Sequence, residues 1–451
     1  MNLDLNFIYQ ALGQEKPIQN SIVHGISTDS RKVTVNDVFF ALKGAHFDGH
    51  QFVSEVLAKG AVAAVVCCDF EMEDPRLIKV DDTLQALGTL AHQWRKSLNL
   101  TLLGITGSSG KTTVKEMVLC ILKEFVPVQS VLATEGNFNN EIGLPLTLLK
   151  LTPEHRFAVI EMGMNHFGEL TRLTQIAQPD IALVNNAQRA HIGCGFDSVA
   201  DIAKAKSEIY IGLSESGVGI YPQEDQYANI FKAAIHSQYC MSFGVEHGDV
   251  HAKALTLEPL SSQFILCTPK GEQDIHLPVA GKHNVSNACA ASSLALCADV
   301  PLEIIAKALA NFQNIKGRLQ QKTGYAGSRI IDDTYNANPE SVRAAIDVLS
   351  RFMPNRILIL GDLGELGDNA KVLHQEIGTY AKKAQVDYLI TLGDLSASAT
   401  VAFGEQAKHF TQIDELVSYV RPLLSQDTNV LVKGSRFMKM ERVVDALLAC
   451  N

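Results

Sequence analysis

One short segment constrains the fold of this chain more than any other. An apolar run at residues 100–105 leads into Gly-Ser-Ser-Gly-Lys-Thr-Thr at 107–113, and we expect a helix over 112–124. Glycines let backbone N–H groups turn toward phosphate oxygens, and the start of the following helix adds a favourable dipole. We therefore predict a phosphate-binding loop that consists of Gly107, Ser108, Ser109, Gly110, Lys111, Thr112 and Thr113.

The charged and hydroxyl side chains of this loop have separate expected roles. Lys111 would supply a positive charge for the β- and γ-phosphates of ATP, and the hydroxyl of Thr112 or Thr113 would bind Mg²⁺. The segment departs from the usual eight-residue pattern, because Ile105 stands where its first glycine belongs. A glycine-rich turn with an incidental lysine is the alternative. A strand before the turn and a helix after it favour the phosphate loop, and so an enzyme that uses ATP.

Composition argues against several classes of protein. With 46% hydrophobic and 20% charged residues, the chain can bury real cores. Its net charge of −10 argues against nonspecific nucleic-acid binding. The longest apolar run, at 61–68, is far shorter than the ~18 residues of a membrane helix, and no secretory signal precedes it. The scattered cysteines lack CxxC or zinc spacing, as is typical of reduced thiols. We expect a cytoplasmic protein without a transmembrane segment.

Chain length and the alternation of apolar runs predict three domains. A chain of 451 residues fits about three units of roughly 150 residues each. Strands that alternate with helices predict mostly parallel, doubly wound sheets with ligands at the carboxyl ends of their strands. We expect a small α/β domain at 1–99, a central ATP-binding domain at 100–312 and a Rossmann-like domain at 313–451. The stretch 249–278 interrupts the alternation, and we expect an antiparallel edge there.

Individual elements follow from the same patterns. Apolar residues at helical spacing predict a helix at 82–96, and further helices are expected at 199–213 and 284–297. Strands are predicted at 157–160, 181–184, 218–221, 329–332, 356–360, 387–392 and 429–432.

Three side chains near the predicted strand ends are candidates for a metal site. Glu161 directly follows a strand and is placed to hold Mg²⁺, although a surface or helix-capping glutamate is the alternative. His191 follows another strand end, where a structural histidine is an equal alternative. Lys206 is expected on a helix, where a lysine is more often a solvated charge.

Five motifs taken together resemble the Mur ligases, the amide-forming enzymes of peptidoglycan precursor synthesis. They occur in the order of that family and over nearly the whole chain: 106–113, 161–164, His191, 205–210 and 281–287. Within the family, the segments 134–147, 332–341 and 432–436 are similar to the member that adds D-alanyl-D-alanine. The Asp-Asn-Pro-Arg expected of the sister enzyme that adds the third amino acid is absent.

The resemblance implies an activity and its reactants. An ATP-dependent ligase would join D-Ala-D-Ala to UDP-muramoyl tripeptide through an acyl phosphate, with one or two Mg²⁺ ions. Because an acyl phosphate hydrolyses readily, the third domain would close over the site to exclude water. A monomer is expected. Whether the third peptide residue is diaminopimelate or lysine stays open.

The resemblance also implies roles for individual residues. Lys111, Lys206, His191 and Arg318 would be catalytic, and Lys206 matches a lysine that sister enzymes carbamylate. Asn284 and Asn287 would contact adenine, while Arg318 and Asp333 would reach the phosphates and ribose of ATP. The metal ligands would be Thr112, Thr113, Glu161, His191 and carbamylated Lys206. Substrate contacts are expected at Ser27, Asp29, Ser30, Arg31, Asn137, Asn139, Asn140, Tyr335, Asn336 and Asn338. For the segment 27–31, which resembles a uridine-nucleotide-binding segment, a capped turn is the alternative.

Two other functions compete with this interpretation. A different ligase of the same superfamily, forming the tripeptide or a folate polyglutamate, is the nearest. The missing Asp-Asn-Pro-Arg argues against the tripeptide ligase, and the muramoyl-type first domain argues against the folate ligase. The alternative from another class is a switch protein that hydrolyses ATP without making a product.

Overall fold

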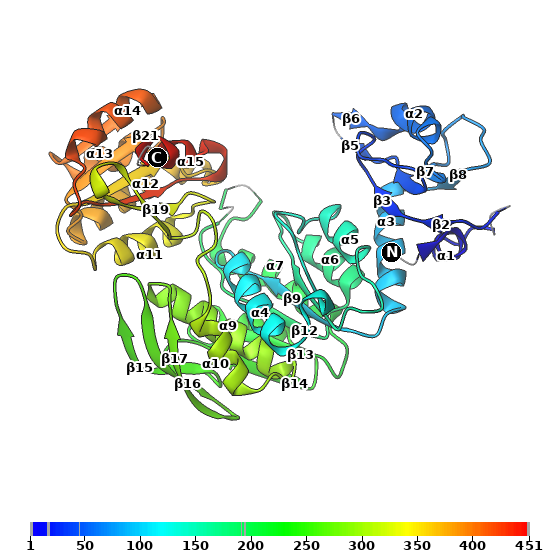
Figure 1. Ribbon diagram of the computed structural model, residues 1–451, viewed down its shortest axis with the longest axis horizontal. Coiled ribbons are helices and arrows are strands. Elements are labelled where there is room, and N and C mark those ends of the chain that lie inside the picture. Colours follow the sequence, from blue (N-terminus) through cyan, green and yellow to red (C-terminus); the bar gives the residue numbers. More distant parts are fainter. Residues whose placement is uncertain (1–2, 16–18, 45, 191, 194, 449–451) are drawn as a thin grey trace.

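The computed structural model describes residues 3–15, 19–44, 46–190, 192–193 and 195–448. Over these residues, three main sheets follow one another along the chain. Figure 1 shows the N-terminal part (blue) and the C-terminal part (yellow to red) on opposite sides of the view, with the central part between and below them. The predicted α/β class with mostly parallel sheets is confirmed.

The N-terminal part is built on a four-stranded parallel sheet in the order β3-β4-β7-β8. Its strands are β3 (Gly25–Ser27), β4 (Asp37–Phe40), β7 (Ala63–Cys67) and β8 (Leu77–Val80). Around it lie β1 (Leu3–Asp4), α1 (Leu5–Ala11), β2 (Ile22–Val23), β5 (Lys43–Gly44), β6 (Phe47–Asp48), the 3₁₀ helix η1 (Gly49–Phe52), α2 (Val53–Ala58) and α3 (Thr83–Lys96).

Helix α3 joins the N-terminal part to the central part. Asp82 caps its start by accepting hydrogen bonds from the backbone of Leu84 and Gln85, so the predicted helix is confirmed. At its other end, the Trp94 indole donates to the Leu151 carbonyl at 3.0 Å. The Arg95 guanidinium pairs with Asp180 at 2.9 Å. One apolar cluster therefore includes residues of both parts.

The central part contains a six-stranded, wholly parallel sheet in the order β10-β11-β9-β12-β13-β14. Its strands are β9 (Thr101–Thr106), β10 (Val131–Ala133), β11 (Phe157–Glu161), β12 (Ile181–Val184), β13 (Val218–Pro222) and β14 (Tyr239–Phe243). Its helices are α4 (Lys111–Phe125), η2 (Val128–Ser130), α5 (Gly143–Leu148), α6 (Glu169–Ala177), α7 (Val199–Ser207), η3 (Glu208–Gly212), α8 (Ala228–Ala234), α9 (Lys282–Cys297) and α10 (Leu302–Ala310).

Side chains on neighbouring positions of β9 face opposite layers. Leu102 belongs to the apolar cluster that also contains residues of α3, α5, α6 and α7. Leu103 and Ile105 belong to the cluster that contains residues of α4, α9 and α10. Because successive side chains of a strand point to opposite faces, a continuous apolar run is what a strand covered on both faces requires.

The stretch expected to form an antiparallel edge forms a sheet of its own. Strands β15 (His251–Leu257), β16 (Ser262–Thr268) and β17 (Gly271–Leu277) pair antiparallel with one another in chain order. Their antiparallel direction was predicted correctly, but their place at the edge of the central sheet was wrong. Phe264 and Leu266 of β16 instead join the apolar cluster of α4, α9 and α10.

The C-terminal part holds a six-stranded sheet in the order β18-β19-β23-β20-β21-β22, in which only the β18–β19 pair is antiparallel among the described strands. The strands are β18 (Gln320–Thr323), β19 (Arg329–Asp333), β20 (Arg356–Gly361), β21 (Tyr388–Leu392), β22 (Ala407–Phe410) and β23 (Asn429–Lys433). The helices are η4 (Tyr325–Gly327), α11 (Pro339–Leu349), η5 (Gly367–Asn369), α12 (Ala370–Lys383), α13 (Ala397–Phe403), α14 (Ile413–Val420), η6 (Arg421–Leu423), η7 (Arg436–Met438) and α15 (Glu441–Leu447).

None of the helices in the described part of the chain has the length and apolar character needed to span a membrane.

Candidate active site

The predicted phosphate loop connects the central strand β9 to helix α4. The turn needs glycine at position 110, where the backbone has φ +79°, the left-handed region. A Cβ atom added there would also lie 2.5 Å from both Asn185 Nδ2 and Asn287 Oδ1. Helix α4 starts at the next residue, Lys111, so its N-terminus lies at the carboxyl edge of the sheet.

Side chains that follow β12 hold the shape of this loop. Asn186 Oδ1 accepts from the Ser109 backbone N–H at 2.9 Å, and Asn185 Nδ2 donates to the Ser109 carbonyl at 2.9 Å. The Gln188 backbone N–H donates to Ser108 Oγ, also at 2.9 Å. Sequence reasoning missed these residues. The available signal was a pair of asparagines directly after a strand at the same sheet edge.

Two charged side chains near the loop, Lys111 and Glu161, influence each other electrostatically. Lys111 Nζ donates to the Gly107 carbonyl at 2.6 Å. Burial lowers the pKa of Lys111, an effect that the nearby Glu161 carboxylate opposes and Arg318 reinforces. Glu161 is the last residue of β11 and only 1% exposed, and this burial raises the pKa of its carboxyl. The Thr112 hydroxyl donates to Glu161 Oε2 at 3.3 Å.

The oxygens around Glu161 fit a hard cation. Its Oε1 atom is buried without a hydrogen-bond partner, and Lys115 Nζ lies 3.9 Å from it. The described residues contain no group of three or more His, Cys, Asp and Glu that could hold a metal alone. Mg²⁺ binds carboxylates together with waters and nucleotide phosphates rather than full protein cages. Glu161 with the hydroxyls of Thr112 and Thr113 therefore fits a magnesium ion that binds with a nucleotide.

The other two predicted metal ligands are Lys206 and His191. Lys206 lies on α7, as predicted, and is only 2% exposed. Burial and the nearby Lys111 ammonium lower the pKa of Lys206 well below its ordinary value. This side chain is therefore a poor candidate for a solvated cation. His191 lies outside the described residues.

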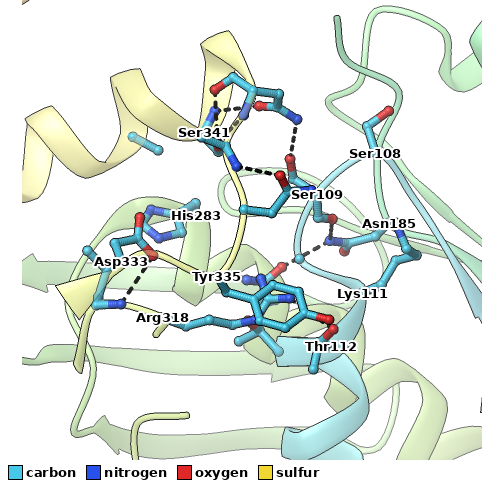
Figure 2. A pocket seen from close by; sticks show the side chains of 18 of the residues that line it. Ser108, Ser109, Lys111, Thr112, Asn185, His283, Arg318, Asp333, Tyr335 and Ser341 are labelled. Atoms are coloured by element: carbon cyan, nitrogen blue, oxygen red, sulfur yellow. Dashed lines mark hydrogen bonds between the residues drawn. The ribbon is translucent and has the colours of Figure 1, made fainter. Parts of the chain in front are cut away.

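The C-terminal part reaches the loop through two side chains. Arg318 Nη2 donates to Thr112 Oγ1 at 3.0 Å, and its guanidinium lies 4.4 Å from the centre of the Tyr335 ring. Asn338 Nδ2 donates to Ser109 Oγ at 2.8 Å. Figure 2 shows Arg318, Tyr335 and Thr112 together at one end of the cleft, with Ser341 and Ser109 at the other.

Asp333 faces the cleft beside His283 of the central part (Figure 2). Its Oδ1 accepts from the Leu319 backbone N–H at 3.2 Å, and its Oδ2 pairs with Lys433 Nζ at 2.5 Å. Burial lowers the pKa of His283 to about 4, although the Asp333 carboxylate opposes this shift. Sequence reasoning missed Lys433 as a partner of Asp333, because the two residues are 100 positions apart.

The two predicted adenine-contacting residues lie in the first two turns of helix α9 and bind each other. Asn287 Nδ2 donates to Asn284 Oδ1 at 3.2 Å, and Asn287 Oδ1 accepts from Asn185 at 3.0 Å. Asn284 Nδ2 donates to the Ala280 carbonyl at 2.8 Å. Both side chains are buried at the wall of the cleft.

These groups line one cleft of about 1290 Å³ between the central and C-terminal parts. The predicted site residues that line it are Ser108, Ser109, Gly110, Lys111, Thr112, Thr113, Asn137, Asn139, Glu161, Asn284, Asn287, Arg318, Asp333, Tyr335, Asn336 and Asn338. Lys206 and Gly107 are not among the residues at its surface. Asn140 is not among them either, and its Oδ1 accepts from the backbone of Ile142 and Gly143 at the start of α5.

The predicted uridine-binding residues lie in the N-terminal part, outside this cleft. Ser27 Oγ accepts from the Asp29 backbone N–H at 3.1 Å. The Asp29 carboxylate binds Arg31 through two hydrogen bonds of 2.8 and 2.9 Å, and Ser30 is buried. The segment thus forms a compact turn whose side chains bind one another.

Comparison with known families accounts for nearly all of the chain. The family model of the Mur ligase middle domain matches residues 105–295, and that of the Mur ligase glutamate ligase domain matches 317–436. The model of the Mur ligase family catalytic domain matches residues 22–95. A ligase from Haemophilus influenzae, UDP-N-acetylmuramoyl-tripeptide–D-alanyl-D-alanine ligase, is 42% identical and aligns over 95% of this chain and 94% of its own length. The chain belongs to the Mur ligase family.

Other Mur ligases are similar over the same length. The Escherichia coli enzyme of the same name is 38% identical over 94% of this chain and 93% of its own. The crystal structure of MurF from Acinetobacter baumannii superimposes with a TM-score of 0.90, at 38% identity over 98% and 97% of the two chains. MurF from Thermotoga maritima, solved in complex with ADP, gives a TM-score of 0.84 at 27% identity over 94% and 96%.

Proposed function

We propose that this Mur ligase joins D-alanyl-D-alanine to UDP-N-acetylmuramoyl tripeptide, with ATP converted to ADP and phosphate. The observation that carries the proposal is the approach of Arg318 to Thr112 beside Lys111, across two domains of a chain that aligns with D-alanyl-D-alanine ligases along nearly its whole length. This geometry supports the proposal, because the Arg318 guanidinium approaches the loop residue next to Lys111, and two cations there would suit the terminal phosphate of a nucleotide.

The reaction needs activation because a carboxylate and an amine do not condense in water. Transfer of the γ-phosphoryl group to the tripeptide carboxylate gives an acyl phosphate, whose leaving group is phosphate. Lys111 and Arg318 offset the repulsion between carboxylate and phosphate and stabilise the charge on the transferred group. The amine of D-Ala-D-Ala then attacks the acyl carbon, and phosphate leaves.

The nucleotide would lie across the two domains. The backbone N–H groups of 107–113 hold its phosphates, Asn284 and Asn287 contact adenine, and Asp333 contacts ribose. Mg²⁺ held by Thr112 or Thr113 and by Glu161 would neutralise phosphate charge. His191 stays a predicted ligand of this ion.

The rest of the chain would bind the other reactants. Domain 1–99 would bind the uridine nucleotide near Ser27, Asp29, Ser30 and Arg31. Asn137, Asn139 and Asn140 of domain 100–312, with Tyr335, Asn336 and Asn338 of domain 313–451, would contact the peptide and the incoming dipeptide. The lining of the cleft by five of these six residues supports this assignment, and Asn140 has less support because it is not among the lining residues. Cytoplasmic location and a monomeric state stay predictions.

Lys206 would become a metal ligand through carbamylation. Burial and the Lys111 ammonium lower its pKa and so favour the neutral amine, whose nitrogen would attack the carbon of CO₂ with loss of one proton. Carbon NMR of protein equilibrated with labelled bicarbonate should give a carbamate signal that Lys206→Ala removes. Wild-type activity of Lys206→Ala would contradict the assignment.

The function is tested by offering the purified protein ATP, UDP-muramoyl tripeptide and a panel of amines, and by weighing the products. We expect D-Ala-D-Ala to add its mass less one water, with one phosphate released per product. Tripeptides ending in diaminopimelate and in lysine, assayed in parallel, identify the acceptor. Phosphate release that ignores both substrates would instead identify a hydrolysing switch.

A further inference from the structure

Arg189 connects the central part to two helices of the C-terminal part. Its Nε binds Glu340 on α11 at 2.5 Å, and its Nη1 binds Glu376 on α12 at 2.9 Å. Arg343 of α11 also binds Glu376, at 3.0 Å. The Arg189 side chain is 24% exposed, and the two carboxylates are 26% and 38% exposed. Charge-assisted bonds that are partly shielded from water are stronger than those of fully exposed pairs.

The backbone that carries Arg189 also supports the phosphate loop. Asn185, Asn186 and Gln188, the residues directly before it, bind Ser108 and Ser109. The Ser108 backbone N–H also donates to the Asn186 carbonyl at 3.1 Å. A shift of Arg189 would therefore also move the segment 185–188, whose hydrogen bonds hold Ser108 and Ser109 of the loop.

Helix α11 meets the central part at its N-terminus. Asn338 is its N-cap, bound reciprocally to Ser341, and the same side chain donates to Ser109 of the loop. Glu340, in the first turn of α11, binds Arg189. One end of a rigid helix thus contacts both the phosphate loop and the segment that supports the loop.

We propose that Arg189 with Glu340 and Glu376 forms a latch that holds the C-terminal domain over the nucleotide site and couples its closure to the shape of the phosphate loop. Arg189 is then a positioning residue, which acts through Asn185–Gln188 and α11 and not by touching a reactant. The inference rests on the proposed use of ATP at this loop.

A direct role is the alternative, because Arg189 and Glu340 both line the cleft. An arginine that binds a phosphate or carboxylate of a reactant would not need its two glutamates. A double-mutant cycle separates the two roles, since partners in one interaction show non-additive effects. The variants are Arg189→Ala, the pair Glu340→Gln with Glu376→Gln, and all three changes together.

The matched control is Arg172→Ala. Arg172 binds Glu141 at 2.8 Å within the central part, so its loss removes an ion pair of the same type without touching the domain interface. Thermal unfolding identifies any variant that fails to fold. The glutamine pair keeps the shape of both side chains and tests the latch independently should Arg189→Ala be unstable.

The first readout is the dissociation constant of a nonhydrolysable ATP analogue with Mg²⁺. We expect Arg189→Ala and the glutamine pair each to weaken binding by about tenfold, the triple variant to match Arg189→Ala within about twofold, and the control to bind normally. Arg189→Lys, which keeps one charge but not the fork, should recover part of the loss. Multiplying effects in the triple variant, or a glutamine pair that binds normally, would overturn the latch.

The second readout is the radius of gyration from solution X-ray scattering, with and without the analogue. The wild type and the control should contract on binding, whereas Arg189→Ala at saturating analogue should stay more extended. Equal contraction by Arg189→Ala would overturn the proposal. Neither readout needs turnover, so failure to make the D-Ala-D-Ala product would reject the proposed function while these measurements still decide the latch.

Discussion

The central and C-terminal sheets both present site residues at the carboxyl ends of parallel strands, but they build their sites differently. The central sheet offers one continuous turn, residues 107–113, whose donors are mostly backbone groups. The C-terminal part offers separate side chains from distant positions in sequence. Asp333 and Lys433 end two strands and pair with each other, and Arg318 precedes the sheet and lies over the Tyr335 ring. The first site is therefore formed within one domain, whereas the second contributes only when the two domains meet.

If the turn 107–113 supplies the main phosphate contacts, removing the Lys111 ammonium group should cause the largest loss of catalytic activity. We expect Lys111→Ala to lower kcat/KM by at least about a hundredfold, because several kcal/mol of charge stabilisation is lost in a water-poor site. Steady-state kinetics measures the effect. Lys123→Ala, at an exposed position near the other end of α4, is the control and should behave as the wild type. A folded Lys111→Ala enzyme with normal turnover would refute the comparison.

The backbone of the turn can be tested without changing any charge. Gly110→Ala combines a left-handed backbone with a contact of 2.5 Å, so we expect a loss of roughly 2–4 kcal/mol in the free energy of unfolding and no detectable ATP binding. Denaturant unfolding and calorimetry measure both.

Gly168→Ala is the matched control for this substitution. Gly168 has φ +84°, close to the +79° of Gly110, but nothing lies within 4 Å of an added Cβ. Only the backbone strain remains there, and we expect a cost of about 1 kcal/mol with normal ATP binding. Equal losses in the two variants would mean that crowding by Asn185 and Asn287 is unimportant.

Substitution of Arg318, which the C-terminal part contributes, should lower activity less than Lys111→Ala does. Arg318→Lys keeps the charge but loses the planar fork that binds Thr112 and stacks on Tyr335, so we expect kcat to fall about tenfold. Arg442→Ala serves as control, because Arg442 is exposed and donates to the backbone carbonyls of its sequence neighbours Met438 and Lys439. A loss as large as that of Lys111→Ala would remove the distinction between the two sites.

The smallest effect on kcat is expected for substitutions of Tyr335, whose ring lies against the Arg318 guanidinium. Tyr335→Phe keeps the aromatic face under the Arg318 guanidinium, so kcat should change by less than about twofold, while Tyr335→Ala should approach the loss of Arg318→Lys. Parallel kinetics of the two variants checks this. A large loss in Tyr335→Phe would assign a direct role to the hydroxyl.

The fold was predictable where the hydrophobic pattern is continuous. Strands such as β11 and β20 are buried on both faces, and their runs of apolar residues were recognised within one residue of their observed ends. The strands β18 and β22 at the sheet edges were missed, since Gln320–Thr323 is half exposed and lacks an apolar run. The strands β15–β17 pair with their neighbours in sequence, but the sequence could not show that they form a separate sheet, because the helices that the sheet packs against are set by tertiary structure.

The candidate site was likewise predictable only where its residues are contiguous in sequence. The phosphate loop is contiguous, so its residues could be named from spacing alone. Arg189, Lys433 and the asparagines after β12 were missed because their neighbours depend on strand order, which places β12 beside β9 and β23 beside β19. The role of Asn140 in substrate binding stays a prediction, and the sequence did not indicate that its side chain accepts from the Gly143 backbone N–H at the start of α5.

The docking of α3 has a practical consequence for anyone who divides this chain into fragments. A cut at residue 99 would leave Trp94 and the apolar face around Leu90 without their cover in one fragment, and would uncover the surface near Leu151 in the other. Both fragments would then expose apolar surface and would tend to aggregate. A cut ahead of Asp82 would keep α3 on the central surface near Leu151, but would uncover the N-terminal surface at Phe7 and Ala41, which α3 also contacts. Helix α3 therefore makes the N-terminal and central parts a single unit for expression.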